Sequence, residues 1–162
     1  MKIDSPEVYC LGSSSSGNAY IFKFIQDDWS HQILVEAGFP YKELVKRALL
    51  QGTRLSECES CIITHCHGDH ATGAKIVNEK GIQVFASKGT LEDKRVGIRA
   101  TEFNTLEEWT PKFIAPSIEV LPFLVEHDAP EPMGFIIRDT YNKQNILFIN
   151  DAKTVKADLS KV

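Results

Sequence analysis

The stretch Thr64-His65-Cys66-His67-Gly68-Asp69-His70 holds three of the five histidines of the chain and one carboxylate. Imidazole and carboxylate groups this close together are the donors that a borderline metal ion such as zinc requires, each at about 2.0–2.2 Å. The apolar residues 61–63 before the stretch are typical of the end of a buried strand. Residues 71–80 after it have apolar side chains three positions apart and precede Gly81, which predicts a helix with a glycine at its end. The sequence therefore predicts a metal-binding loop between a strand and a helix.

The spacing divides these donors between two ions. His65 and His67 are two positions apart, so on extended backbone they point the same way and can bind one ion together. Asp69 and His70 lie where the helix begins and point elsewhere, which suits a second ion a few ångströms away, as in two-metal hydrolases. Asp69 as a plain helix cap is the alternative, but it does not explain three histidines on one turn.

The pattern His-x-His-x-Asp-His after a buried strand resembles the signature of the metallo-β-lactamase superfamily of metallohydrolases. The resemblance extends through residues 12–18, 35–38, 126–128 and 150–151. The chain is most similar to the small bacterial and phage branch with a Gly-Ser-rich loop after the first strand, whose members include DNA exonucleases and cyclic-nucleotide phosphodiesterases. The resemblance implies an α/β (α+β) fold, the four-layer αββα sandwich of that superfamily.

The resemblance also implies two metal sites. The first would consist of His65, His67 and His127, the last of which lies 57 positions after His70. The second would consist of Asp69, His70 and Asp151. A structural role for His127 and a helix-capping role for Asp151 are the alternatives. Zinc is the expected ion and manganese the other candidate, since the donor types do not decide between them.

Further roles come from the same resemblance. Asp69 would orient the attacking water as well as bind metal, which makes it the candidate catalytic residue. Glu36, where relatives usually carry aspartate, would lie below the metal loop and orient a ligand imidazole. Ser16, Asn18 and Asp128 would lie beside the substrate.

Composition points to one domain over residues 1–162, with 43% hydrophobic and 25% charged residues. We expect a cytoplasmic protein without a membrane span, because the chain has neither a signal peptide pattern nor an apolar run near 18 residues. The net charge of −4 does not favour nucleic acid, so metal ions must supply the positive charge for a phosphodiester. Reduced thiols are expected for the four cysteines, rather than disulfides or a metal site at Cys58-x-x-Cys61.

Hydrophobic periodicity predicts the remaining elements. A helix is expected over residues 40–51, with its charged side chains solvated, and Ser87 is expected to cap a short helical turn. Residues 95–116 could form a lid or a plain connection, and residues 12–18 a plain hairpin or an anion-binding loop. The predicted strands are 8–11, 19–25, 32–36, 83–86, 118–125 at an edge or bulge because of Pro122, and the hairpin 134–138 with 145–149.

The C-terminal part breaks the family pattern. Relatives are usually longer and complete the second metal site with a late histidine, whereas 11 residues follow Asp151 here and none is histidine. The second half therefore looks shortened, which leaves open a fragment, completion by another subunit, or an incomplete second site. Strand residues 146–149 are apolar on both faces, as expected if something packs on each side. A homodimer or a lost C-terminal segment would supply that cover.

The most direct expectation is a metal-dependent hydrolase that cleaves a phosphodiester, in DNA or a cyclic nucleotide. The same metal pair also serves hydrolysis of a lactone, a thioester or a β-lactam, which is the first alternative. The second alternative is a protein that binds metal without catalysis.

Overall fold

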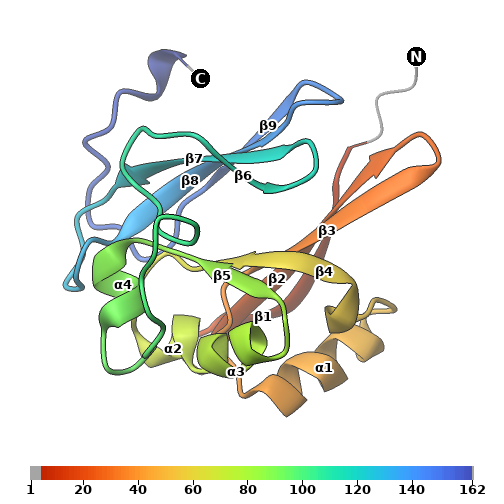
Figure 1. Cartoon of the computed structure of the whole chain (residues 1–162), viewed down its shortest axis with the longest axis horizontal. Helices are drawn as coiled ribbons and strands as arrows, with labels where there is room; N and C mark the ends of the chain where they lie inside the picture. Colours follow the sequence, from red (N-terminus) through yellow and green to blue (C-terminus); the bar gives the residue numbers. More distant parts are fainter. Residues whose placement is uncertain (1–4, 162) are drawn as a thin grey trace.

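The computed structural model describes residues 5–161, which form two sheets packed face to face (Figure 1). The first sheet has the strand order β1-β2-β3-β4-β5 and the second the order β6-β7-β8-β9. The strands are β1 (Glu7–Ser14), β2 (Gly17–Gln26), β3 (Trp29–Val35), β4 (Cys58–Ile62), β5 (Gln83–Phe85), β6 (Lys112–Ala115), β7 (Ile118–Leu124), β8 (Met133–Asp139) and β9 (Gln144–Phe148). Hairpins join β1 to β2 and β2 to β3, whereas β3, β4 and β5 run parallel.

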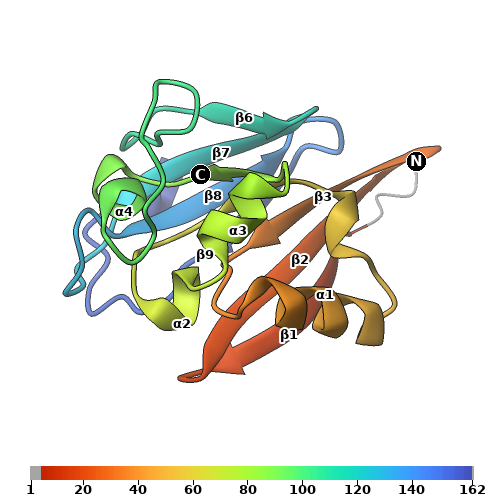
Figure 2. The same cartoon turned by 60° about the horizontal axis from the view of Figure 1, so that its bottom comes forward.

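The helices lie on the face of the first sheet that points away from the second, as Figure 2 shows for α1 and α3. Side chains alternate along the strands, as expected for a sheet covered on both faces. In β2, Ile21 packs under the helices while Phe22 and Phe24 enter the core between the sheets. The helices are α1 (Tyr41–Leu50), α2 (Gly68–Ala71), α3 (Ala74–Glu79) and α4 (Lys88–Glu92), with short 3-10 turns at Leu55–Glu57 and Leu159–Lys161.

The chain after β9 occupies the place of a fourth layer. Ala152, Val155, Ala157 and Leu159 pack against a small cluster on the outer face of the second sheet, formed by Phe123, Val125 and Ile136. Within residues 5–161, no α-helix covers this face. The expected sandwich is therefore present, with an extended segment where the fold family suggests helices. None of the described helices is long and apolar enough to cross a membrane.

Helix α1 agrees with the predicted span to within a residue, but its faces differ from the prediction. Leu44 and Ala48 are buried, whereas Leu49 is 57% exposed. Arg47 was expected in solvent; instead its guanidinium lies 4.1 Å from the centre of the Phe39 ring and donates to Leu11 O at 2.9 Å. Arg47 thus connects α1 to strand β1 of the first sheet through its hydrogen bond to Leu11 O.

The single helix predicted over residues 71–80 is wrong, because Thr72 and Gly73 separate α2 from α3. The backbone of Gly73 lies against the segment before α1, and a Cβ atom there would stand 2.3 Å from Phe39 O. Its N–H donates to Ala37 O at 2.8 Å. This contact of Gly73 with residues 37–39 ends α2 directly after the metal-binding residues. Two local predictions are confirmed: Gly81 has a φ of 91°, and Ser87 Oγ accepts from Thr90 N at the start of α4.

The serine-rich stretch 12–18 is not an open loop. Ser13 pairs with Asn18 and Ser14 with Gly17, so strands β1 and β2 continue to a two-residue turn at Ser15 and Ser16. The stretch is therefore a plain hairpin, and strand pairing occupies most of the backbone groups that an open anion-binding loop would offer to a ligand. The place of Ser16 and Asn18 beside a substrate stays a prediction.

Strand β7 lies between β6 and β8 and is not the edge strand that Pro122 suggested. The short β6 pairs with residues 118–120 only, so Pro122 lies beyond it and removes no hydrogen bond to that neighbour. The connection before β6 is packed, since Val96, Ile98 and Leu106 are buried, and Leu106 N donates to Ala86 O. This part of residues 95–116 is a plain connection rather than a loose insertion.

The hairpin of β8 and β9 agrees with the predicted spans to within a residue. Within residues 5–161 one face of β9 is covered, because Phe148 packs on Tyr20 and Phe22 while Leu147 is 52% exposed. Cover of the other face by a homodimer or a further segment stays a prediction. Strand β9 is an edge strand with one covered face.

Candidate metal centre

Donor side chains from four segments meet at one end of the sandwich. His65 and His67 follow β4, Asp69 and His70 belong to α2, His127 follows β7, and Asp151 follows β9. The fold thus brings together all six residues that the sequence and the family resemblance assigned to metal ions. Their positions depend on both sheets.

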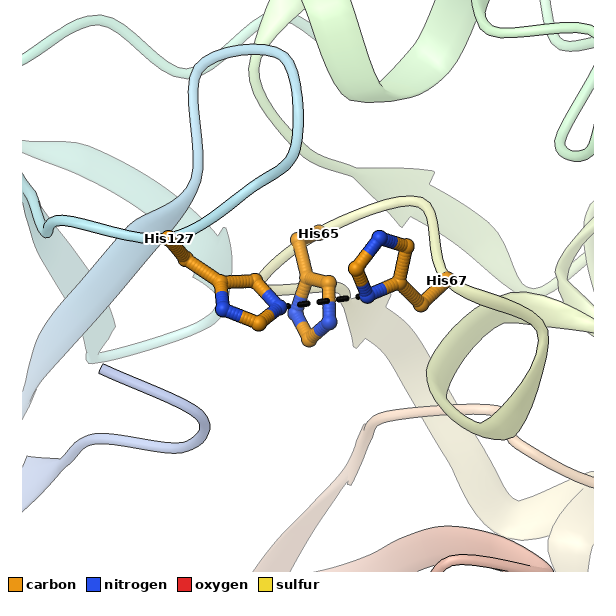
Figure 3. Close-up of side chains that lie close together, drawn as sticks. All are labelled: His65, His67 and His127. Atoms are coloured by element: carbon orange, nitrogen blue, oxygen red, sulfur yellow. Dashed lines mark hydrogen bonds between the residues drawn. The ribbon is translucent and has the colours of Figure 1, made fainter. Parts of the chain in front are cut away.

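The first group consists of His65, His67 and His127, whose ring nitrogens lie within 4.8 Å of one another (Figure 3). His127 Nε2 and His67 Nδ1 are 3.1 Å apart. Two nitrogens bound to one tetrahedral zinc ion at 2.0–2.1 Å would be separated by about 3.3 Å. His127 Nδ1 lies 3.3 Å from Asp128 Oδ1, so its Nε2 is the nitrogen turned to the group.

The second group consists of His65, His70 and Asp151. Asp151 Oδ2 lies 2.9 Å from His70 Nε2 and 3.8 Å from His65 Nε2. His65 therefore takes part in both groups, which the spacing argument did not anticipate. Asp69 Oδ2 lies 3.5 Å from His70 Nε2, at the margin of this group rather than in its centre.

The donor set fits a divalent metal ion because a buried nitrogen at its centre has no hydrogen-bond partner in the described part of the chain. His65 Nδ1 lies 2.9 Å from Thr64 Oγ1, while His65 Nε2 is buried and has no hydrogen-bond partner among residues 5–161. A buried polar atom without a partner costs about 1–3 kcal/mol. An ion coordinated by Nε2 removes that cost.

Glu36 supports the metal loop from below. Its fully buried carboxylate accepts from Thr64 Oγ1 and, at 3.3 Å, from Thr64 N, and it lies 3.5 Å from His70 Nδ1. The Thr64 hydroxyl donates to Glu36, so its oxygen is left to accept from His65 Nδ1–H. This relay fixes the tautomer of His65 with Nε2 free for a ligand. The longer glutamate thus reaches the position that the resemblance implied.

Electrostatics favour a neutral His65. Burial, and then the charges of His70, His127 and their neighbours, lower the pKa of His65 to about 3. Only a neutral imidazole binds metal, so this ligand needs no deprotonation near neutral pH. Burial by itself would also lower the pKa of His70, but the carboxylate of Glu36, 3.5 Å from Nδ1, together with Asp69 and Asp151, raises it overall. Burial raises the pKa of Glu36 against the opposing effects of His70 and Thr64.

The three residues expected beside the substrate lie in different surroundings. Asn18 is buried, and its Nδ2 donates to Ser14 O at 3.0 Å and to Asp69 O at 3.3 Å. It therefore holds the β1–β2 hairpin against α2. Ser16 is exposed at the hairpin tip, where its N–H donates to Ser14 Oγ. Asp128 is exposed beside His127.

Two neighbours of the site were missed by sequence reasoning. Thr64 had no signal beyond preceding His65, because its role depends on Glu36 being 28 positions away. Arg95 donates from Nη2 to Cys66 Sγ at 2.9 Å and pairs with Asp93. The Cys66 thiol contacts this arginine and is in neither donor group. All four cysteines are free, as predicted.

Comparisons with known proteins agree with the fold. A family model described as a beta-lactamase superfamily domain matches residues 31–162. No curated protein matches the chain. Among solved structures, a metallo-beta-lactamase with a HARLDQ motif from Cronobacter sakazakii is similar, with a TM-score of 0.64 and 13% identity, covering 86% of this chain and 60% of that one.

Two further solved structures show the same likeness. A subclass B3 metallo-beta-lactamase of Bradyrhizobium japonicum has a TM-score of 0.64 and 14% identity, covering 93% of this chain and 66% of that one. Another subclass B3 metallo-beta-lactamase, isolated from a soil metagenome library, has a TM-score of 0.61 and 17% identity, covering 86% and 58%. The chain thus spans 58–66% of the length of these proteins, and identities this low show the fold alone.

Proposed function

This chain belongs to the beta-lactamase superfamily, and we propose that it is a metal-dependent hydrolase whose substrate is a phosphodiester. One observation carries the proposal. Two donor groups meet at His65, whose buried Nε2 is without a hydrogen-bond partner among the described residues and can bind one ion. Donor groups that adjoin in this way, with His70, Asp151 and Asp69 beside the three-histidine group, suit two cations a few ångströms apart, the spacing of metal pairs in phosphodiester-cleaving enzymes.

The proposed ligands follow from the two groups. His65, His67 and His127 would hold one ion, and His70, Asp151 and Asp69 the other, with zinc as the expected metal and manganese as the second candidate. When bound, such ions supply Lewis-acid stabilisation of negative charge and make water more acidic.

The side chains of the protein have their own tasks in this proposal. Asp69 is partly exposed beside His70 Nε2, so its carboxylate can orient a water molecule and accept its proton. The relay from Glu36 through Thr64 keeps His65 Nε2 unprotonated. Asp128 Oδ1, 3.3 Å from His127 Nδ1, helps to orient the His127 ring so that Nε2 faces the donor group.

A phosphodiester matches the charges around this site. The chain has a net charge of −4. Arg95 contacts Cys66 of the metal loop, but its charge is paired with Asp93. Positive charge for a substrate anion must therefore come from the ions themselves. DNA and cyclic nucleotides are the candidate substrates of this class.

Two other functions each have an observation in their favour. The similar solved structures are metallo-beta-lactamases, which favours hydrolysis of a β-lactam, a lactone or a thioester. The second donor group draws on three residues, one of them shared, which favours a protein that binds metal without catalysis.

A side-by-side assay separates these functions. Protein loaded with zinc or manganese is offered bis(p-nitrophenyl) phosphate, linear DNA, a cyclic nucleotide, a lactone and nitrocefin. We expect hydrolysis of the phosphodiesters, loss of that activity in His67→Ala and Asp69→Ala, and retention in the control His31→Ala, whose histidine pairs with Glu59 away from the site. Hydrolysis of nitrocefin or the lactone alone would contradict the proposal, as would equal activity in all variants.

A further inference from the structure

A groove of about 520 Å³ lies next to the metal centre and has no role in the mechanism above. It runs between the connection before β6 and the chain after β9, and His127 forms part of its wall. The same histidine belongs to the first donor group, so the groove adjoins the site. It is the place where a substrate larger than its reacting group can extend from the metal centre.

The groove has an aromatic and apolar surface. Trp109 lines it and is 42% exposed, and Leu124 and Val125 continue the apolar lining toward His127. The indole stacks on the buried Phe123 ring, with the ring centres 5.9 Å apart and the planes 24° apart. Trp109 N donates to Pro122 O at 2.8 Å, and its φ of 56° is unusual for a bulky residue. The indole of Trp109 is therefore fixed in position, and its exposed part can stack with a planar ring of a ligand.

The rim of the groove is acidic. Three carboxylates line it, those of Glu108, Glu126 and Asp158, against one cation, Lys156. Lys156 Nζ is 3.8 Å from Glu126 Oε2, and Glu108 Oε1 accepts from Leu124 N. The remaining negative charge attracts hydrogen-bond donors and repels phosphate.

We infer that this groove binds the base of a small nucleotide substrate, a flat heterocycle with amino hydrogen-bond donors, while the phosphodiester lies at the metal donors beyond His127. The inference rests on the proposed phosphodiesterase function and narrows its substrate. Stacking on Trp109 supplies affinity for any base, and the carboxylates select bases that carry amino groups. A long nucleic acid strand fits poorly, because its further phosphates would pass the acidic rim.

Tryptophan fluorescence tests the groove without metal, phosphate or catalysis. The chain has two tryptophans, Trp109 in the groove and Trp29 at the start of β3. The variant Trp29→Phe leaves Trp109 as the only reporter, and Trp109→Phe leaves Trp29. We expect adenosine and cytidine to quench the emission of Trp29→Phe and not that of Trp109→Phe, with weaker quenching by inosine, which lacks the amino group. Absence of quenching in Trp29→Phe would overturn the inference.

Binding of adenosine 5′-monophosphate to the metal-loaded protein gives the second measurement. We expect Trp109→Ala to weaken binding by about tenfold or more, as loss of base stacking does elsewhere. The matched variant Trp29→Ala should bind as the wild type does. Equal binding of adenosine 5′-monophosphate by the two variants would refute base binding in the groove, even if the protein hydrolyses phosphodiesters. Conversely, nucleoside quenching without hydrolysis of any phosphodiester would support the groove and count against the proposed function.

Discussion

The two sheets differ in how completely they are covered. The first has helices on one face and the second sheet on the other, so Ile33, Leu34 and Val35 in β3 are all buried. The second has the first sheet on one face and, among residues 5–161, the chain after β9 and Trp109 on part of the other. Four of the six metal donors follow strands of the first sheet, and His127 and Asp151 follow strands of the second. The metal centre therefore joins a well-covered half to a sparsely covered one.

A matched pair of leucines measures this difference. Leu34→Ala in β3 should lower the free energy of unfolding by about 2–5 kcal/mol, since it leaves a cavity in a fully buried position. Leu147→Ala in β9 should cost less than about 1 kcal/mol, because half of that side chain is already in solvent. Urea unfolding of metal-free protein gives both values. Similar costs for the two variants would show that the second sheet is as well packed as the first.

A glycine tests how closely the well-covered half approaches the metal loop. A Cβ atom at Gly38 would stand 1.9 Å from Asp69 O, so Gly38→Ala must displace α2. We expect a loss of stability of about 1–3 kcal/mol and weaker zinc binding. The control Gly68→Ala meets only Thr72 Oγ1 at 3.5 Å and should fold and bind zinc as the wild type does. Calorimetric zinc titration and urea unfolding check both, and an unaffected Gly38→Ala would refute the close contact.

The relay below the metal loop gives a smaller effect. Thr64→Val removes the hydroxyl between Glu36 and His65, and we expect zinc affinity to fall about 10–100-fold. The control Thr72→Val loses only a hydrogen bond to Gly68 O and should keep its affinity. Competition with a chromogenic chelator measures both constants. Unchanged affinity in Thr64→Val would mean that the relay does not orient His65.

The exposed edge of the second sheet predicts weak self-association as the smallest effect. Strand β9 is an edge without charged side chains, with Leu147 exposed, and soluble proteins usually protect such edges. We expect sedimentation at increasing concentration to show dimers, reduced in Leu147→Lys and unchanged in Val8→Lys on β1, an edge strand of the first sheet. A monomer at all concentrations would show that the chain after β9 covers the sheet sufficiently.

Sequence reasoning succeeded where the signal is local. The donors of residues 65–70 stand together in the sequence, and Gly81 and Ser87 mark helix ends by their own conformational preferences. Such features depend on neighbours within a few positions. His127 and Asp151 came from family resemblance, because no periodicity links positions 57 and 81 residues after His70.

The errors lie where distant contacts override local preference. The break at Gly73 depends on Phe39 O, and the inner position of β7 depends on how short β6 is. The serines of residues 13–16 suggested a loop, yet the β1–β2 pairing continues almost to the turn. The sharing of His65 by both donor groups likewise depends on where Asp151 returns to the site.

Metal stoichiometry in His65 variants tests the central claim most directly. Native mass spectrometry after zinc loading should find two ions in the wild type and one in His65→Ala, because the variant removes a ligand of the first ion and leaves His70, Asp151 and Asp69 for the second. His127→Ala belongs to one group and should lose one ion and keep the other. A His65→Ala variant that retains both ions with wild-type affinity would contradict the two-metal centre on which the proposed function depends.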